Sequence, residues 1–596
     1  MLIYKAPLRD IRFVLYELLD AGELAQLPGF AEASPDLVDA VLEEAAKFCE
    51  SKLLPLNQSG DREGCRFENG VVRTPSGFKE AYATFAEGGW AGLACDPAYG
   101  GEGLPEALNF VVVEMICASN VAFGTYPGLS RHAYQALETH APEAIKRLCL
   151  PRLASGAWSG TMCLTEPQCG TDLGLIRTKA VPAADGSYAV TGTKIFISAG
   201  EHDLTDNILH LVLARLPDAP SGTRGISLFL VSKLLWHDDG SLGSRNGVRC
   251  GGIEHKMGLA GSATCTLQFD GAVGYLIGQP NRGLNCMFTM MNAARLAVGL
   301  QGMGIAEVAY QNARSYARDR LQGRALAGAR YPDRPADPII VQPDVRRMLL
   351  TMKAGIEGAR ALAYWTAVNI DIAHRHPSAE KRQEADELVQ LLTPVIKACL
   401  TDLGFEAANL GVQIYGGHGY IRDNGMEQLV RDARIAQIYE GTNGIQALDL
   451  VGRKMSAHYG RLLRRFFHPV AQFLAETSGD LQLQEFVSPL AKAFDRLQRA
   501  TLKIAERGLR NPDEAGAAAY DYLRLMGLVA QGYMWNRMTR LATSALDRGA
   551  PDATFYQTKI ATARFFTQRI LPQSSSLFAA IMVGGRSITE VEEQAL

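Results

Sequence analysis

The order in which periodic patterns follow one another along this chain is what most restricts its fold. Apolar residues recur at helical spacing from Ser34 to about Leu148, short strand-like runs fill residues 156–280, and helical spacing returns from Leu284 onward. Because the strands form one block and do not alternate with helices, the order favours an α+β fold over repeated βαβ units. No Gly-x-Gly-x-x-Gly joins a strand to a helix, so the sequence offers no Rossmann fingerprint for a dinucleotide.

A length of 596 residues is enough for about three to five domains. We predict a division at the points where the pattern changes: an N-terminal extension (1–33), an N-terminal helical domain (34–155), a β domain (156–280), a C-terminal helical bundle (281–458) and an additional helical domain (459–596). Within the bundle, long helices are expected near 284–320, 342–375, 378–414 and 427–455.

Composition excludes several classes of function. The net charge of -3 gives no electrostatic reason to expect a nucleic-acid partner or an anionic membrane surface. Pro7 and Asp10 interrupt the region where a signal peptide needs an apolar run, and no stretch of eighteen uncharged apolar residues is present. The eleven cysteines are scattered and form no CxxC pair, which indicates reduced thiols and no metal site. We therefore expect a cytoplasmic protein without an integral membrane segment.

Two segments of the β region carry groups suited to a bound polar heterocycle. Residues 162–172 read as a strand followed by a turn with exposed hydroxyls and backbone amides. Residues 194–200 read as an alternating strand that presents an aromatic ring and then a hydroxyl before a glycine. Each has an ordinary alternative, because a strand that ends in a polar turn and a plain core strand show the same patterns.

The strongest pattern lies in residues 413–444. Two helical segments are joined by a glycine-rich loop, residues 413–420, whose backbone can approach a ligand closely. The second segment ends in Glu440, which is followed by Gly441 and other residues that break or cap a helix. A glutamate at such a break in an apolar context is a candidate general base, and the alternative is a helix-terminal glutamate in a salt bridge.

Together these segments resemble the acyl-CoA dehydrogenase family. The resemblance spans about Ser34 to Lys454 and rests on the order of its motifs: Trp90-Ala-Gly-Leu, Tyr99-Gly-Gly-Glu-Gly-Leu-Pro, Thr165-Glu-Pro, Lys256-Met-Gly-Leu with Gly261-Ser, Asn292-Ala-Ala-Arg and Tyr439-Glu-Gly-Thr. The longer start and the extra C-terminal region resemble the subgroup of about 600 residues. That subgroup includes enzymes for 3-methylmercaptopropionyl-CoA and bacterial dehydrogenases for medium- and long-chain acyl-CoAs.

The resemblance implies a fold and a cofactor. The fold is an N-terminal helical domain, a central antiparallel β-barrel-like domain and a C-terminal four-helix bundle, here followed by the extra helical domain. FAD would extend between the β domain and the bundle and reach a neighbouring subunit, which implies a homodimer or a dimer of dimers. Carried over residue by residue, the cofactor contacts fall on Met162, Leu164, Thr165, Thr171, Phe196, Ser198, Arg320, Gln413, Gly416, Gly417 and Thr442.

Four departures from the family pattern affect these cofactor positions, and the first is Thr171, which takes the place of a Ser. Phe196 stands where the family usually has Trp against the flavin face, and Ser198 stands where it usually has Thr beside flavin N5. Both departures keep the aromatic ring and the hydroxyl, so we expect FAD binding to survive them. The segment after Arg320 lacks the family's Phe before Gly, which weakens the match at that contact.

The resemblance also implies the chemistry. Glu440 matches the catalytic base, which removes the α-proton of a saturated acyl-CoA while the β-hydrogen passes as hydride to flavin N5, giving the trans-2-enoyl-CoA. Substrate contacts are implied at Thr171, Arg295, Tyr439 and Gly441. We expect a medium- or long-chain fatty acyl-CoA in β-oxidation, with 3-methylmercaptopropionyl-CoA as the alternative and electron-transferring flavoprotein as the acceptor.

Other classes of flavoprotein remain as alternatives. An acyl-CoA oxidase would share the base and the flavin but pass electrons to oxygen. A nitroalkane oxidase-like enzyme usually carries Asp at the position of Glu440. A non-catalytic or DNA-associated flavoprotein of the same fold would call for a basic C-terminal surface, which the net charge of -3 does not favour.

The C-terminal extension carries one small basic cluster. Arg461, Arg464 and Arg465 stand beside Phe466 and Phe467. Such a cluster fits an amphipathic membrane anchor. It also fits a helix that packs on the core or on a partner subunit, and we favour this second interpretation because the run is short.

Overall fold

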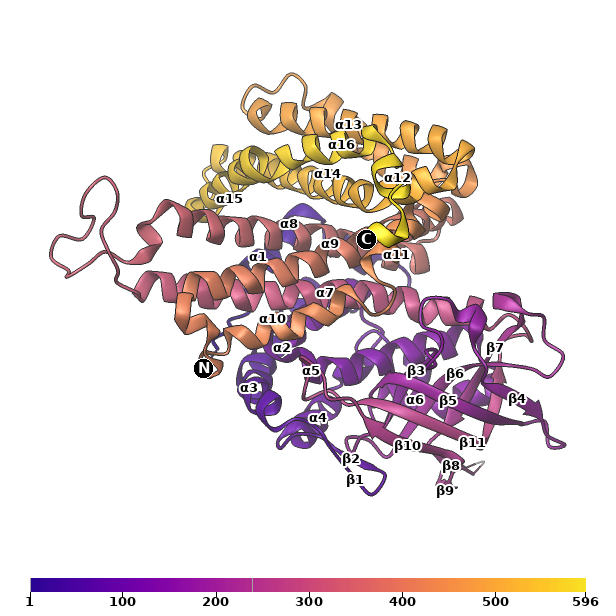
Figure 1. Cartoon of the computed structure of the whole chain (residues 1–596). Helices are drawn as coiled ribbons and strands as arrows, with labels where there is room; N and C mark the ends of the chain where they lie inside the picture. The colour runs from indigo at the N-terminus through magenta and orange to yellow at the C-terminus, as the bar shows by residue number, and fades with distance from the viewer. Residues whose placement is uncertain (1, 238) are drawn as a thin grey trace. The chain divides into compact units, whose positions relative to one another are not determined.

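The computed structural model describes residues 2–237 and 239–596 (Figure 1). The chain forms two compact units: unit 1 comprises Met1–Glu43, Pro105–Glu114 and Val298–Leu596, and unit 2 comprises Glu44–Leu104 and Met115–Ala297. Three helices pass from one unit to the other along the chain: α2 (Pro35–Phe48), α5 (Glu106–His140) and α7 (Gly283–Asp319). Helical regions flank one block of strands, which confirms the predicted α+β organisation.

Unit 2 contains the sheet and the helices that cover it. Its shorter helices are α3 (Leu54–Glu63), α4 (Phe78–Glu87) and α6 (Glu143–Ala154), and β1 (Arg66–Glu68) with β2 (Val71–Arg73) forms a separate hairpin. The strands of the β domain are β3 (Trp158–Cys163), β4 (Lys179–Pro182), β5 (Tyr188–Ser198), β6 (Asn207–Arg215), β7 (Ile226–Ser232), β8 (Leu234–Trp236), β9 (Leu242–Arg245), β10 (Val248–Ile253) and β11 (Thr264–Ile277).

The main sheet closes on itself. Its strands pair in the order β10-β11-β5-β4-β6-β3, and β7 pairs with both β11 and β6. The strands β11, β5, β4, β6 and β7 therefore form a ring, which gives the barrel-like domain that the family resemblance implies. Most pairings are antiparallel, whereas β3 lies parallel to β6 and β4 meets β6 in one parallel pairing.

Strands β6 and β7 lie between two apolar cores. On β6, Leu211 and Leu213 belong to a core shared with α5, α6 and the start of α7, whereas Val212 and Ala214 belong to the core inside the ring. Successive strand residues point to opposite faces, so a strand that is buried on both faces must be apolar throughout. This explains why residues 208–214 are apolar apart from the buried His210 and do not alternate with polar residues.

Unit 1 is built on three long helices: α7, α8 (Pro343–Arg375) and α9 (Ala379–Tyr415). Helices α7 and α9 run parallel, because Gly302 of α7 lies against Leu400 of α9 and Tyr316 of α7 stacks on Tyr415 of α9. A Cβ at Gly302 would come within 2.3 Å of the Leu400 carbonyl oxygen, so the two backbones touch at this crossing. The prediction of a single long helix near 427–455 was wrong: the structure has the shorter α10 (Met426–Arg434) and α11 (Asn443–Asp449), separated by residues Glu440 and Gly441 with positive φ.

The C-terminal extension packs on this bundle within unit 1. Its helices are α12 (Arg461–Glu476), α13 (Gln484–Arg510), α14 (Pro512–Asp547), α15 (Ala553–Phe565), α16 (Ser574–Val583) and α17 (Arg586–Thr589). The buried Trp535 of α14 donates to the Ala354 carbonyl of α8 at 3.1 Å, and Arg465 of α12 pairs with Glu384 and Glu387 of α9. The basic cluster is thus partly neutralised against α9, and Phe466 is fully buried, as expected for a packing helix.

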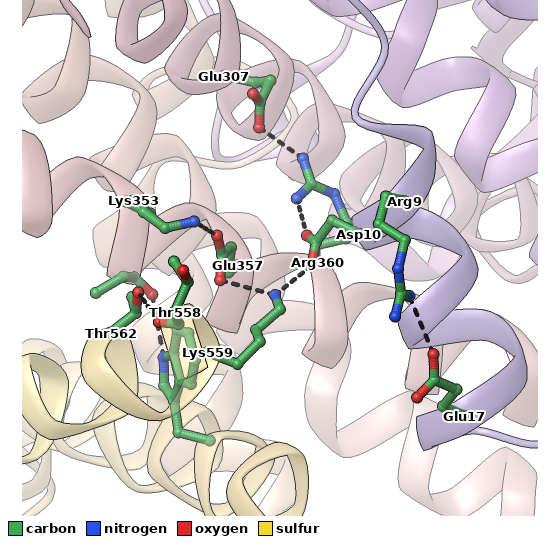
Figure 2. Close-up of polar contacts among 12 residues, drawn as sticks. Arg9, Asp10, Glu17, Glu307, Lys353, Glu357, Arg360, Thr558, Lys559 and Thr562 are labelled. Atoms are coloured by element: carbon green, nitrogen blue, oxygen red, sulfur yellow. Dashed lines mark hydrogen bonds and ion pairs between the residues drawn. The ribbon is translucent and has the colours of Figure 1, made fainter. Parts of the chain in front are cut away.

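A buried group of charges joins the two ends of the chain inside unit 1 (Figure 2). Arg360 of α8 lies 2.5 Å from Asp10 in α1 (Leu8–Arg12) and 2.7 Å from Glu307 in α7. It also lies 2.6 Å from Glu114 in α5. Lys559 of α15 pairs with Asp10 and also lies 2.7 Å from Glu357 of α8. The group therefore connects the N-terminal extension, the bundle and the C-terminal extension.

Within the residues that the structure describes, two helices are long and apolar enough to cross a membrane by length and composition. They are Glu106–His140 and Ala379–Tyr420, and 83% and 67% of their apolar windows are buried inside the protein. Core helices of soluble proteins meet the same criterion.

Candidate active site

In unit 2, the turn that follows β3 is built around the buried Glu166. Its carboxylate accepts hydrogen bonds from Lys194 Nζ at 2.8 Å, from Thr178 Oγ1 at 2.6 Å and from the Arg177 backbone N–H at 2.7 Å. Lys194 Nζ also donates to the Leu164 carbonyl at 2.9 Å. Burial acts to raise the pKa of Glu166, but the Lys194 charge and these hydrogen bonds outweigh it and hold the pKa at about 2. Glu166 is therefore an ionised anchor of the turn.

This anchor holds the predicted residues of the turn beside strand β5. Thr165 accepts from the Ile195 backbone N–H at 2.9 Å, which joins the turn to the segment that carries Phe196 and Ser198. Met162 and Leu164 are half-buried against the outer core, and Thr171 is exposed farther along the turn. The structure thus brings the predicted flavin contacts of β3 and β5 into one region of unit 2.

A bulge in β5 turns Phe196 outward. Cys265 of β11 pairs with Ile197 and Leu267 pairs with Lys194, so two residues of β5 lie opposite one residue of β11. Phe196 has a φ of 58°, in the left-handed region that a bulky residue rarely adopts, and 59% of its surface is exposed. A strained bulge that exposes an aromatic ring is typical of a ligand site.

In unit 1, Glu440 occupies a strained turn at the start of α11. Glu440 and Gly441 follow one another in the left-handed region, with φ values of 55° and 85°. Thr442 caps α11, because its hydroxyl accepts the Ile445 backbone N–H at 3.2 Å. Behind the turn, the fully buried Gln446 donates through Nε2 to the carbonyl oxygens of Glu440 at 3.3 Å and Gly441 at 3.1 Å. A strained conformation persists only where the surroundings hold it in this way.

A second set of contacts holds the residues on either side of Glu440. Asn443 is buried and accepts from Lys397 Nζ of α9 at 2.8 Å, while its Nδ2 donates to Asp402 Oδ1 at 2.8 Å. Gln437 Nε2 donates to the same Asp402 oxygen at 2.6 Å. Tyr439 is held separately, through a hydrogen bond from its hydroxyl to Gln301 of α7.

The predicted cofactor residues Arg320, Gln413, Gly416 and Gly417 gather at the C-terminal ends of α7 and α9. The stacked rings of Tyr316 and Tyr415, with centroids 4.1 Å apart, hold these helix ends together. Gly416 has a φ of 59°, and a Cβ added there or at Gly417 would meet no atom within 4 Å. The backbone of this loop is therefore open to a ligand.

These four residues lie away from Glu440. Tyr439 bonds to Gln301 of α7 and Gln437 bonds to Asp402 of α9, so Glu440 lies near these two positions. Arg320 directly follows α7 and lies 19 residues beyond Gln301. At 1.5 Å per residue, that separation is about 28 Å, and Gln413 lies about 16 Å beyond Asp402. Within one chain, these residues cannot touch the same small group as Glu440. The remaining predicted contact, Arg295, is buried on α7 in unit 2 and donates to Asn292 at 3.2 Å.

Comparison with known proteins assigns the whole chain. Residues 36–157, 161–272 and 281–455 match the N-terminal, middle and C-terminal domains of acyl-CoA dehydrogenase, and residues 466–592 match the domain described as acetyl-CoA dehydrogenase C-terminal like. The 3-methylmercaptopropionyl-CoA dehydrogenase of Ruegeria pomeroyi is 44% identical over 98% of this chain and 99% of its own length. This chain belongs to the acyl-CoA dehydrogenase family.

Other members of the acyl-CoA dehydrogenase family match over the full length. The broad-specificity linear acyl-CoA dehydrogenase FadE5 of Mycobacterium tuberculosis is 34% identical over 99% of both chains. Among solved structures, Caenorhabditis elegans ACDH-11 in complex with C11-CoA has a TM-score of 0.77 at 21% identity, covering 95% of this chain and 91% of that one. A Bacillus anthracis acyl-CoA dehydrogenase complexed with FAD has a TM-score of 0.74 at 21% identity, covering 94% and 90%. The last two likenesses concern the fold.

The sequence pattern did not identify the residues that hold the Glu440 turn of this acyl-CoA dehydrogenase. Lys397, Asp402 and Gln446 carry no motif of their own, and their roles follow from contacts with the segment around Glu440. One signal was available: Lys397 interrupts the apolar run 391–400 and is nevertheless fully buried. A buried lysine requires a polar partner, so a lone lysine in such a run predicts a buried polar contact.

Proposed function

We propose that this protein catalyses the α,β-dehydrogenation of a saturated acyl-CoA thioester, with FAD as cofactor and Glu440 as the base. The observation that carries the proposal is the strained turn of Glu440, held by Gln446 and Asn443 in a chain whose every domain matches the family. Positioning of a reacting group contributes to the rate only if its geometry is held in advance. Glu440 removes the α-proton, and the turn keeps its carboxylate in place for that step.

The residues of unit 2 fit the cofactor. FAD, when bound, accepts the β-hydrogen as hydride at flavin N5. Phe196 offers an exposed ring for the flavin face, and Thr165 and Ser198 offer hydroxyls on adjoining segments. Met162, Leu164 and Thr171 extend this surface, and Thr442 serves the same cofactor. Four residues of unit 1 serve the cofactor of a neighbouring subunit: Arg320, Gln413, Gly416 and Gly417. Arg295, Tyr439 and Gly441 serve the substrate.

For the acyl group, the relative from Ruegeria pomeroyi favours 3-methylmercaptopropionyl-CoA as the first substrate to test. Medium- or long-chain acyl-CoAs in β-oxidation are the second candidate, supported by FadE5, a relative described as acting on linear acyl-CoAs. Each buried methylene contributes about 0.8 kcal/mol, so a pocket of the wrong depth discriminates strongly between them. We further propose electron-transferring flavoprotein as the acceptor, a homodimer as the assembly and the cytoplasm as the compartment.

The test is an anaerobic titration of the flavin-loaded protein with saturated acyl-CoAs from C4 to C16 and with 3-methylmercaptopropionyl-CoA. One chain-length group should bleach the flavin absorbance. Glu440→Gln should keep the flavin spectrum and lose bleaching by about 1,000-fold or more, because the base is gone. The matched control is Glu380→Gln, the same change at an exposed position of α9, which should bleach as the unmodified protein does.

Three outcomes would contradict parts of the proposal. Bleaching by no thioester would reject the dehydrogenase function and favour a non-catalytic or DNA-associated flavoprotein. Rapid peroxide formation in air without a carrier would favour an acyl-CoA oxidase. Unchanged bleaching by Glu440→Gln would reject Glu440 as the base.

A further inference from the structure

Asp402 of α9 is the meeting point of three segments that are far apart in sequence. Its Oδ1 accepts from Gln437 Nε2 at 2.6 Å and from Asn443 Nδ2 at 2.8 Å. Its Oδ2 accepts from the Tyr520 hydroxyl at 2.7 Å. Gln437 precedes Glu440 by three residues and Asn443 follows it by three, so one carboxylate oxygen holds both sides of the strained turn.

The third segment belongs to the C-terminal extension. Tyr520 lies on α14, the helix that also packs on α8 through Trp535 and on α9 through Gly527. A carboxylate held at only one oxygen can swing about its Cβ–Cγ bond, whereas a hydroxyl at the second oxygen fixes its plane. The position of α14 thereby determines how Asp402 is presented to Gln437 and Asn443.

We propose that the C-terminal extension braces the Glu440 turn through Tyr520 and Asp402, so that Tyr520 is a positioning residue for the reaction. The proposal rests on the proposed function, because it takes Glu440 as the base. Without the Tyr520 hydroxyl, the Asp402 carboxylate tilts, the bonds to Gln437 and Asn443 lengthen, and the turn leaves its left-handed conformation more often. Glu440 is then in place less often, so proton removal slows. The thioester keeps its contacts with Arg295, which lies on α7, and with Tyr439, whose hydroxyl bonds to Gln301 of α7.

The first experiment compares Tyr520→Phe with Tyr522→Phe in the full-length, flavin-loaded protein. Tyr522 lies on the same helix, and its buried hydroxyl shares a hydrogen bond of 2.7 Å with Thr501 inside the extension, so its loss is a matched control. The flavin reduction rate is measured by anaerobic rapid mixing with 3-methylmercaptopropionyl-CoA. We expect Tyr520→Phe to lower the limiting rate by about 3- to 10-fold, the effect of one hydrogen bond, and to change the Kd of the thioester by less than about twofold. Tyr522→Phe should keep the limiting rate.

A second comparison shows whether Tyr520 acts through Asp402. In Asp402→Asn, the side chain has one oxygen and one NH₂, so it no longer accepts hydrogen bonds on both sides. Adding Tyr520→Phe to this variant should slow reduction no further, because coupled residues are not additive. An additional loss equal to that of Tyr520→Phe alone would overturn the link, and so would equal slowing in Tyr520→Phe and Tyr522→Phe.

Amide hydrogen exchange tests the brace without any reaction. The Ile445 and Gln446 amides donate to Thr442, so their exchange reports opening of the turn. We expect about fivefold faster exchange of the peptide that contains them in Tyr520→Phe and no change in Tyr522→Phe. Unchanged exchange in Tyr520→Phe would overturn the brace even if the enzyme is active. Failure of the unmodified protein to be reduced by any thioester would instead reject the proposed function and leave the exchange result standing.

Discussion

Gln446 shows how much a single buried amide contributes to the turn of Glu440. Its Nε2 lies behind two consecutive left-handed residues and donates to both of their carbonyl oxygens. Neither contact is visible in a sequence pattern, because a glutamine in a helix has the same local sequence signal whether its amide meets water or the backbone of a turn.

We predict that Gln446→Met, which keeps the volume and removes the donor, slows flavin reduction by about 10-fold and destabilises the protein by about 1–3 kcal/mol. Two partly buried carbonyl oxygens lose a partner, and the strained turn loses a restraint. Rapid-mixing kinetics and urea unfolding measure the two effects. Gln390→Met is the control, because the Gln390 amide donates to the exposed Asp386 and lies outside the Glu440 turn. Equal kinetics in the two variants would contradict the role of Gln446.

At the scale of the element, the ion pair of Glu166 and Lys194 fastens the turn after β3 to strand β5. Both side chains are almost fully buried, at 3% and 0% exposure. Removing one partner of a buried pair leaves the other charge without compensation, whereas removing both restores much of the stability. Thr165 lies on the turn and Phe196 lies on β5. Because the ion pair holds these two segments together, it also maintains the predicted flavin surface.

Glu166→Gln should therefore lower the free energy of unfolding by about 3–5 kcal/mol at pH 7, and Glu166→Gln with Lys194→Met should recover most of it. The fall in the free energy of unfolding at acid pH, here called the acid limb, should change as well. Burial alone would raise the pKa of Glu166, yet Lys194 and the hydrogen bonds hold it at about 2, below the ordinary 4.5. The resulting stability is present in full above about pH 4.5 and is lost as the pH falls toward 2. Urea unfolding between pH 2 and 7 should show a shallower acid limb in Glu166→Gln, and an identical limb would contradict this role.

At the scale of the whole molecule, the buried charges of unit 1 connect residues from both ends of the chain (Figure 2). Burial acts to raise the pKa of Asp10, but the charges of Lys559 and Arg360 outweigh it and lower the pKa well below its usual value. The network unites α1, α8 and α15, so the C-terminal extension is part of the same folding unit as the bundle.

Lys559→Met should destabilise the protein by about 3–5 kcal/mol, because Asp10 and Glu357 keep their buried charges and lose a cation. Urea unfolding provides the free energy, and limited proteolysis should cut the C-terminal extension sooner. Lys503→Met removes an exposed pair with Glu506 on α13 and should cost less than about 1 kcal/mol. Similar losses in the two variants would show that the buried network does not hold the extension.

The sequence by itself determined the elements and the family. The long helices near 284–320, 342–375 and 378–414 agree closely with α7, α8 and α9, because helical periodicity is set by neighbours three and four residues apart. The β region 156–280 was also predicted as a block, although its shorter strands β4, β8, β9 and β10 were not recognised individually, and β1 and β2 were missed, since strands of three to six residues carry too little periodicity. The turn at Glu440 was recognised because glycine and capping residues follow it directly.

Only the tertiary structure decided what holds the candidate site. The bulge that exposes Phe196 depends on the register between β5 and β11, which lie about 70 residues apart. Asp402 meets Tyr520 across 118 residues, and Lys559 meets Asp10 across 549. Local patterns indicate which conformation a segment prefers, whereas these contacts form between segments that folding brings together. Such long-range contacts produce no periodicity in the sequence, so the residues that brace Glu440 are identified only once the helices are packed.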